Sequence, residues 1–519
     1  MMSEKRKPGD RHLLVNALSV VMILIGALAI VLFCLTVLND PGIQLALNWT
    51  PGDGDAPAPS LLLIFLERFG IIVSALFIGA GGFFMAIGWR LRHGHIRTAY
   101  WARILLMWLA VGIGATIALT AFNIFNNAAM DRQVVDWGAL VEATAPALLS
   151  MLGAAALWYW LNRNINSLFG GEDSLIGRET RLAWNLLIPT LAIFVLVAAR
   201  PLEQTFIRSL TDKRFAGSAV PQFVGLENYA NLLTIRLDTV DCRKSDPDDP
   251  CSTRANGSIR WESIDRELLR EGYRTVANIS VGNEQSLAIS GLDDDFIEAI
   301  GTTVLFTVVS VALELVIGLF MAMVVNSKFR GRGAMRAIML VPWAIPTVIS
   351  ARLWELMLKD TSAGIFNKIL LDLGAIEAPL AWLADPALQI PTAIIVDVWK
   401  TAPFMALLLL AGLQVIPSDL HEAASVDGAS PVRRFFSITL PLLRPAIAIA
   451  LIFRTLDALR VFDLFNVLFG RQQLSMATYN FETLVSNQLD GYASAISVII
   501  FIFISIFAFI YVRLLNVES

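Results

Sequence analysis

The sequence predicts an all-α polytopic membrane protein with about ten transmembrane helices and a small extracytoplasmic loop domain. Of its 519 residues, 56% are hydrophobic and only 16% are charged, whereas soluble domains average about 45–50% apolar and about 25% charged residues. The apolar residues fall in runs of about 20 or more, which can cross a hydrocarbon layer of about 30 Å as helices. Lys and Arg gather in alternate connections between these runs, as the positive-inside rule requires.

Ten apolar runs are candidate spans. In chain order they cover residues 13–37, 61–89, 104–124, 140–161, 182–200, 298–325, 337–358, 391–416, 444–467 and 493–513. If the N-terminus is cytoplasmic, Lys and Arg recur in every inside connection and are scarce in the four short outside connections. This distribution predicts that the N- and C-termini both lie in the cytoplasm.

The polar segments divide the chain into parts. Residues 1–181 form an N-terminal extension with four spans, and residues 182–519 hold the last six. Residues 201–297 form one long polar outside segment, which we expect to fold as a small extracytoplasmic domain. Residues 417–443 form an inside loop that is patterned like folded structure rather than being merely basic.

Cys242 and Cys251 flank the polar stretch CRKSDPDDPC in the long outside segment. A disulfide between them is expected if this segment faces an oxidising compartment, and two reduced loop thiols are the alternative. The segment contains no histidine to complete a zinc site. The sequence therefore predicts no metal site.

The inside loop begins with a predicted short helix. Ser418 or Asp419 can cap its N-terminus, and with Asp419 as the cap, Glu422 occupies the third helical position of a capping box. Gly428 is placed to end this helix in a left-handed conformation.

A second short helix is predicted after the glycine. Ser430 caps it, Pro431 takes its first position, and Pro441 and Pro445 end it. Two helices joined by a glycine turn would suit docking to a cytoplasmic partner. The alternative is an interfacial loop that only connects two spans.

Ionisable residues inside spans are costly and usually face a cavity or a neighbouring helix. The ninth span carries Arg454, Asp457, Arg460 and Asp463 at intervals of three, which is salt-bridge spacing on a helix. A structural ladder is one interpretation, and the other is that Asp457 and Arg460 face a solute pathway. Glu314 is expected to pair with a cation in the bundle, and Lys400 is a candidate.

The stretch EAASVDGASPVRRFFSITLP, residues 422–441, resembles the EAA loop of the membrane subunits of bacterial ABC importers. The resemblance implies that this loop is the coupling helix that enters a cleft of the ATPase subunit. The residues at the family spacing are Glu422, Ala423, Ala424, Gly428, Ile438, Leu440 and Pro441.

Further segments resemble carbohydrate-importer permeases of the maltose-transporter type over residues 182–519. They are FVGLENYANLL (223–233), FRGRGAMRAIMLVPWAIPTVISARLW (329–354), GIFNKILLDLG (364–374), WLADP (382–386), LAGLQVIPSDLHEAA (410–424), LRVFD (459–463) and DGYASA (490–495). The sequence departs from the family at GTT (301–303), where Asn-Thr is common, and at FGRQQ (469–473), where GGP is usual. The resemblance implies a six-helix permease core.

The same resemblance implies which residues line the substrate pathway. Aligned on the family motifs, the positions of sugar contact are Trp343, Thr347, Lys400, Thr401, Phe404, Asp457 and Arg460. An aromatic ring can pack against the apolar face of a pyranose, and polar groups can bond its hydroxyls. This set is more charged than in a maltose permease, which leaves the exact solute open.

By this resemblance, the chain is a permease subunit of an ATP-driven importer for maltose, trehalose or another α-glucoside in the bacterial inner membrane. The implied partners are a second permease subunit in a heterodimer, two ATPase subunits, an extracytoplasmic solute-binding protein, the carbohydrate and membrane lipid, but no nucleic acid. The chain has no G-x-x-x-x-G-K-[ST] motif. We therefore expect no catalytic residue and no cofactor in this chain, with ATP and Mg²⁺ bound by the ATPases.

Two other functions remain open from the sequence. One is an ion-coupled secondary transporter that uses Asp457 or Glu314 as its proton or sodium site; it gives no reason for the EAA loop. The other is a permease-like anchor, which would assemble with partners but transport nothing.

Overall fold

The computed structural model describes most of the chain. The described residues are 8–48, 60–92, 96–130, 137–169, 179, 183, 186, 187, 190, 191 and 194–514, apart from 217–220, 245–250, 254–258 and 283. The chain divides into two compact units, Met1–Gln204 and Thr205–Ser519. The predicted boundary at residue 181 falls within a stretch of which the structure describes only scattered residues.

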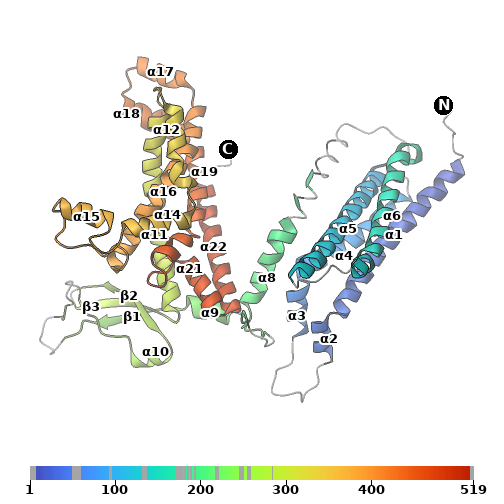
Figure 1. Ribbon diagram of the computed structural model, residues 1–519, viewed down its shortest axis with the longest axis horizontal. Helices are drawn as coiled ribbons and strands as arrows, with labels where there is room; N and C mark the ends of the chain where they lie inside the picture. Colours follow the sequence, from blue (N-terminus) through green and yellow to red (C-terminus); the bar gives the residue numbers. More distant parts are fainter. Residues whose placement is uncertain are drawn as a thin grey trace. The chain divides into compact units, whose positions relative to one another are not determined.

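The first unit is built from long apolar helices (Figure 1). Its elements are α1 (Pro8–Leu38), α2 (Pro41–Leu47), α3 (Leu61–Arg68), α4 (Ile71–Leu91), α5 (Ile96–Met130), α6 (Trp137–Phe169), the π-helical turn η1 (Val195–Ala199) and the start of α8 (Arg200–Ser209). Helices α1 and α4 pack closely, and the Ser19 hydroxyl donates to the carbonyl of Gly88 at 2.6 Å. Leu18, Met22 and Leu91 lie in the buried core of this unit.

The second unit is a helical bundle with a small sheet at one end (Figure 1). Helices α11 and α16 pack against each other, and α19 contacts both of them as well as α22. The elements are α9 (Glu227–Leu233), β1 (Ile235–Asp241), α10 (Arg266–Arg270), β2 (Arg274–Ser280), β3 (Gln285–Gly291), α11 (Asp294–Asn326), α12 (Arg332–Met339), α13 (Val341–Ala344), α14 (Thr347–Met357), α15 (Ile365–Asp372), α16 (Pro386–Val415), α17 (Ser418–Val426), α18 (Pro431–Arg434), η2 (Phe435–Thr439), α19 (Leu440–Ala458), α20 (Asp463–Leu468), α21 (Met476–Phe481), η3 (Glu482–Ser486) and α22 (Asp490–Leu514).

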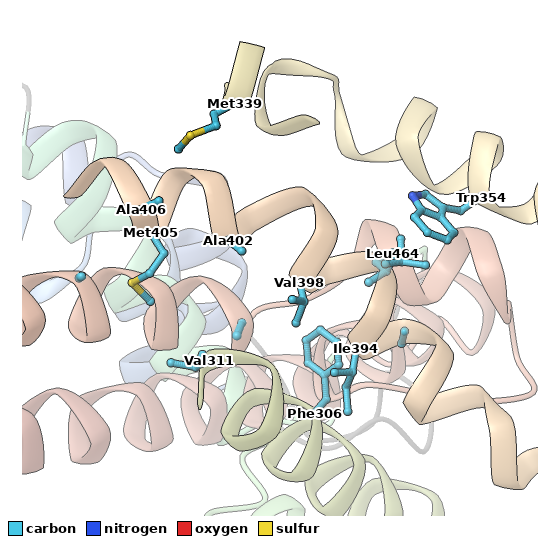
Figure 2. Packing of buried hydrophobic residues seen from close by; sticks show 14 of the residues in the cluster. Phe306, Val311, Met339, Trp354, Ile394, Val398, Ala402, Met405, Ala406 and Leu464 are labelled. Carbon is cyan, nitrogen blue, oxygen red and sulfur yellow. The ribbon is translucent and has the colours of Figure 1, made fainter. Parts of the chain in front are cut away.

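Helix α16 lies at the centre of the main hydrophobic core. Figure 2 shows Ile394, Val398, Ala402 and Met405 along this helix, with Phe306 of α11 near Ile394. All five side chains are buried. A helix that is apolar around most of its circumference is one enclosed by other helices, so α16 is placed to carry polar side chains into the interior of the bundle.

Eight described helices are long and apolar enough to cross a membrane, and a bent helix pair makes a ninth span if counted as one. The eight are Leu13–Leu38, Ile71–Leu91, Thr98–Ala118, Thr144–Ile165, Asp294–Asn326, Pro386–Val415, Pro431–Ala458 and Asp490–Tyr511. The remaining predicted span, residues 182–200, is described only in part, as scattered residues up to 191 and then 194–200. The structure is therefore an all-α polytopic membrane protein with a small added sheet.

Three predicted spans were wrong as continuous helices. The span predicted at 337–358 is a pair, Arg332–Ala344 and Thr347–Met357, bent by 86°, because Pro346 has no N–H with which to continue the first helix. The span predicted at 444–467 stops at Ala458, and the span predicted at 61–89 is interrupted before α4 at Gly70, where φ is +71°.

The long polar segment, residues 201–297, contains a three-stranded antiparallel sheet with the order β1-β3-β2. The sheet packs on α10 through a small core that includes Val240, Leu268 and Ala288. Cys242, next to the end of β1, forms a disulfide with Cys251. The bond closes a short loop at the edge of the domain.

Replacing both Cys242 and Cys251 with serine is expected to lower the unfolding free energy of this domain. The chain-entropy value for so short a loop is about 2–3 kcal/mol. Urea-dependent proteolysis of the full chain, with and without reductant, measures the change. The control is Cys34→Ser, which removes the exposed free thiol of α1 and should change nothing. Identical proteolysis midpoints for the double variant and the unchanged chain would contradict the expectation.

Candidate functional site

The loop at residues 417–443 forms a rigid elbow at the end of the bundle opposite the sheet (Figure 1). Helix α17 ends at Val426, and Gly428 follows with φ +79°. The backbone N–H of Ala429 donates to the carbonyl of Ala424 at 2.9 Å, which closes the end of the helix. The Ser430 hydroxyl then caps α18 by accepting from the N–H of Arg433. The glycine turn and the second cap are as predicted.

Other details of the elbow differ from the prediction. Pro417 precedes α17 without a side-chain cap, so the predicted capping box from Asp419 to Glu422 does not form. The chain also does not break at Pro441: α18 continues through the π-helical turn η2 into α19, which accommodates Pro445. Pro441 therefore lies inside a continuous helix, directly after the π-helical turn, and such turns are one of the irregularities by which a helix accommodates a disturbed hydrogen-bond ladder.

The outer surface of the elbow is open to a partner. Glu422 and Gly428 are exposed, and three large apolar side chains beside them, Val426, Val432 and Phe436, are 88%, 67% and 61% exposed. On the inner side, Arg434 donates to the carbonyl of His421 at 3.2 Å and joins α18 to α17.

A cavity of about 390 Å³ lies between the elbow and the ends of α11 and α16. Its lining includes Asn326, Ile416, His421 and Phe435. The remaining residues of the family spacing, Ile438, Leu440 and Pro441, are half-buried where the elbow joins α19. The elbow is thus fixed to the bundle at its base and exposed at its tip.

The predicted pathway residues on the seventh and eighth spans meet at the break between α13 and α14. Trp343 of α13 stacks on Phe404 of α16, with ring centroids 4.9 Å apart and planes 7° from parallel. The Lys400 ammonium donates to the carbonyls of Ile345 at 2.5 Å, Trp343 at 3.4 Å and Pro342 at 3.5 Å. Lys400 was predicted to contact substrate, but in the structure its ammonium is engaged by the protein backbone.

Thr347 follows this break directly, and Thr401 belongs to α16. Thr347 is half-buried at the first position of α14. The Thr401 hydroxyl is buried and lies 2.7 Å from a carboxylate oxygen of Glu314. Of the two threonines, only Thr347 is therefore partly exposed.

A buried ionic cluster joins α11, α16 and α19. Arg454 donates through Nε to Glu314 at 2.5 Å, through Nη2 to Glu314 at 2.8 Å and to Asp397, and through Nη1 to Asp457 at 2.8 Å. The Glu314 side chain is fully buried, those of Arg454 and Asp397 are 4% and 12% exposed, and that of Asp457 is 68% exposed. One guanidinium thus binds three carboxylates, and Asp457 alone of the three is open to solvent.

The cluster corrects two predictions. The partner of Glu314 is Arg454 rather than Lys400. The four-residue ladder is also divided, because α19 ends at Ala458 and Asp463 begins α20. Arg460 lies exposed between them and donates to the carbonyl of Leu456. Asp397 was not singled out from the sequence, although an acidic residue inside an apolar span was a signal for it.

The two departures from the family pattern are in contact. The side-chain amide of Gln473 donates to the Thr302 hydroxyl at 2.7 Å, and both side chains are buried. The hydroxyl of the adjacent Thr303 accepts from the backbone N–H of Met476 at 2.9 Å. The altered residues therefore form one joint between α11 and the start of α21.

A second joint lies where β3 leads into α11. Asp293 caps α11 and accepts hydrogen bonds from the hydroxyls of Tyr479 and Tyr492, each at 2.7 Å to one carboxylate oxygen. Burial and the Asp293 charge raise the pKa of Tyr479 above its usual value. The three-stranded sheet is thereby connected to α11, α21 and α22. Within the described ranges, no group of three His, Cys, Asp or Glu side chains could hold a metal ion.

Comparisons with known proteins place the second unit among membrane transport components. Residues 314–517 match the family described as the binding-protein-dependent transport system inner membrane component. The chain is 50% identical over 217 residues to the trehalose/maltose transport system permease protein MalF of Thermococcus litoralis, which covers 41% of this chain and 72% of that protein.

Two further relatives match over similar lengths. The trehalose transport system permease protein SugA of Mycobacterium tuberculosis is 39% identical over 268 residues, or 51% of this chain and 83% of that protein. The sulfoquinovosyl glycerol transport system permease protein SmoG of Agrobacterium fabrum is 37% identical over 231 residues, or 44% of this chain and 74% of that protein.

Proposed function

Because the chain belongs to the carbohydrate ABC importer permeases of the maltose-transporter type, we propose that it forms half of the sugar pathway of an ATP-driven importer. The elbow carries this proposal: it is rigid, exposed and located at the end of the bundle opposite the sheet. The chain itself lacks the glycine-rich phosphate-binding motif of ATPases. An external ATPase subunit that docks on the elbow would supply the driving force.

The partners follow from the same arrangement. Two ATPase subunits would bind this elbow and that of a second permease subunit, and a solute-binding protein would deliver sugar at the end of the bundle that carries the sheet. The exposed Val426, Val432 and Phe436 beside Glu422 suit a partner cleft with an apolar floor. The termini and the elbow would then share the cytoplasmic side of the inner membrane.

The proposed substrate is trehalose, maltose or a related α-glucoside. Support comes from the relatives named for trehalose and maltose and from the side chains near the break. Trp343 is 45% exposed, and its ring can pack on the apolar face of a pyranose. The exposed oxygens of Asp457 can accept hydrogen bonds from sugar hydroxyls.

An ion-coupled transporter is not favoured, because its two candidate carboxylates are already engaged. Glu314 accepts two hydrogen bonds from Arg454 and lies within hydrogen-bond distance of Thr401. Asp457 is held by the same guanidinium. The Arg454 guanidinium occupies the position where a proton or sodium ion would have to bind and leave. It would compete with that ion for the two carboxylates.

Uptake of radiolabelled trehalose and maltose into proteoliposomes tests the proposed function. The vesicles hold this chain, its permease partner, the ATPase and the binding protein. We expect uptake that requires enclosed ATP and persists when proton and sodium gradients are collapsed. Uptake that follows an ion gradient without ATP would support the secondary transporter instead. Normal assembly without any sugar uptake would support the anchor.

A further inference from the structure

The break between α13 and α14 leaves backbone carbonyls that no helical N–H can satisfy. In a continuous helix the carbonyl of Pro342 would accept from residue 346, which is a proline and has no N–H. Helix α13 is followed at once by the 86° bend. Buried carbonyls at such a break need another donor or a cation.

In membrane transporters with broken helices, unwound carbonyls and helix ends commonly coordinate a bound cation. Here the Lys400 ammonium occupies that position, with three carbonyl oxygens between 2.5 and 3.5 Å away. Lys400 is only 9% exposed. The ammonium, which is attached to the chain, therefore takes the place that a bound monovalent cation would occupy.

The surrounding charge also favours a cation at this position. Asp397 precedes Lys400 by three residues on α16, and Asp457 shares the Arg454 guanidinium with Asp397. Together with Glu314 they are three acids, against the two cations Arg454 and Lys400. Removal of the ammonium would take one positive charge away from this acidic surrounding, which is unfavourable at low dielectric.

Helix α16 holds Trp343 in two ways. Lys400 binds its backbone carbonyl, and Phe404, one turn further along α16, stacks on its ring. Trp343 as a whole is still 45% exposed. The position of this exposed ring therefore depends on the ammonium that fixes the backbone beneath it.

We propose that Lys400 is a built-in cation of the broken span, which replaces a bound monovalent cation and positions Trp343 on the sugar pathway. Its role toward sugar rests on the proposed function, whereas its role as a cation does not. Lys400 is in this respect a positioning residue rather than a contact to substrate. The proposal predicts that a vacated site will accept a small cation from solution.

Chemical rescue of Lys400→Ala tests the cation role on the purified full chain, without partners or sugar. Thermal unfolding is followed in a buffer whose only cation is N-methyl-D-glucamine, and then with methylammonium, sodium, potassium or tetramethylammonium chloride added. We expect a midpoint several degrees below that of the unchanged chain, raised by methylammonium but not by tetramethylammonium. Equal responses of the variant and the unchanged chain to every salt would overturn the proposal.

If Lys400→Ala does not fold, two more variants can still test the cation role by thermal unfolding. Lys400→Met retains the length of the side chain without its charge, and Lys400→Arg retains the charge. We expect Lys400→Arg to remain closer to the unchanged chain in unfolding midpoint, and a Lys400→Met variant as stable as the unchanged chain would refute the cation role. Lys368→Ala, which removes an exposed lysine of α15, is the matched control.

Sugar uptake by the assembled transporter tests the positioning role separately. Lys400→Ala should lower uptake roughly tenfold or more, as expected for loss of charge-assisted hydrogen bonds, and methylammonium should restore part of it. Rescue of thermal stability without rescue of uptake would contradict the positioning role alone. Absence of uptake even with the unchanged chain would count against the proposed function and leave the thermal result standing.

Discussion

Replacing Arg454 with methionine is expected to destabilise the chain by about 3–5 kcal/mol, the cost of breaking a buried ion pair by removing one partner. Glu314 is fully buried and would lose both of its hydrogen bonds from the guanidinium, and Asp397 would lose its bond as well. Methionine fills much of the space, so the loss comes mainly from uncompensated charge. Denaturant unfolding of the purified chain in detergent measures the difference.

A charge-neutral background separates this effect from lost packing. Glu314→Gln and Asp397→Asn in the Arg454→Met chain should restore most of the lost stability, because replacing a whole buried ionic group costs far less than orphaning one part of it. Arg460→Met is the matched control, since its side chain is exposed and donates only to a carbonyl of the preceding turn. If Arg454→Met and Arg460→Met lose equal stability, the cluster does not hold the three helices.

Replacing Gly428 with valine is expected to lower ATP-driven uptake strongly while the bundle stays folded. Gly428 has φ +79° and open space around it, so the penalty comes from the backbone alone. A β-branched residue in this conformation costs on the order of 1–3 kcal/mol. That cost lowers the population of the docking geometry by roughly tenfold or more. Co-purification of the ATPase and uptake in vesicles measure the effect.

The matched control is Gly374→Val in the turn after α15, away from the elbow. Gly374 also has a positive φ, +67°, and nothing near its Cα hydrogen. The two valines should cost similar stability, but only Gly428→Val should release the ATPase. Glu422→Ala should weaken the same contact without backbone strain. Full uptake in Gly428→Val vesicles would exclude the elbow as the coupling element.

Local features of this protein were predictable from the order of its residues. Long apolar runs imply spanning helices because a bilayer satisfies no backbone polar groups. Gly428 and Ser430 end one helix and begin the next because a left-handed turn and a hydroxyl cap act over a few residues. The same pattern did not predict the missing capping box at Asp419, where the structure places Pro417 at the cap position instead.

The buried ionic cluster was only partly predictable. Asp457 and Glu314 were identified because charge inside an apolar span is costly. Arg454 could not be identified as their common partner, since it lies 140 residues from Glu314 and 57 residues from Asp397 along the chain. Spacing by three along the ninth span suggested a ladder through Asp463, but the helix ends at Ala458.

Sequence alone was sufficient for the class of membrane protein, for the elbow and for the family resemblance, because these depend on hydrophobicity and on residues close together in the chain. Tertiary structure was needed for the broken seventh span, for the partner of Glu314 and for the role of Lys400. Each of these depends on which side chains of α11, α16 and α19 face one another. Packing brings side chains together that are far apart in the sequence. Which charged groups become partners is decided only in the folded bundle.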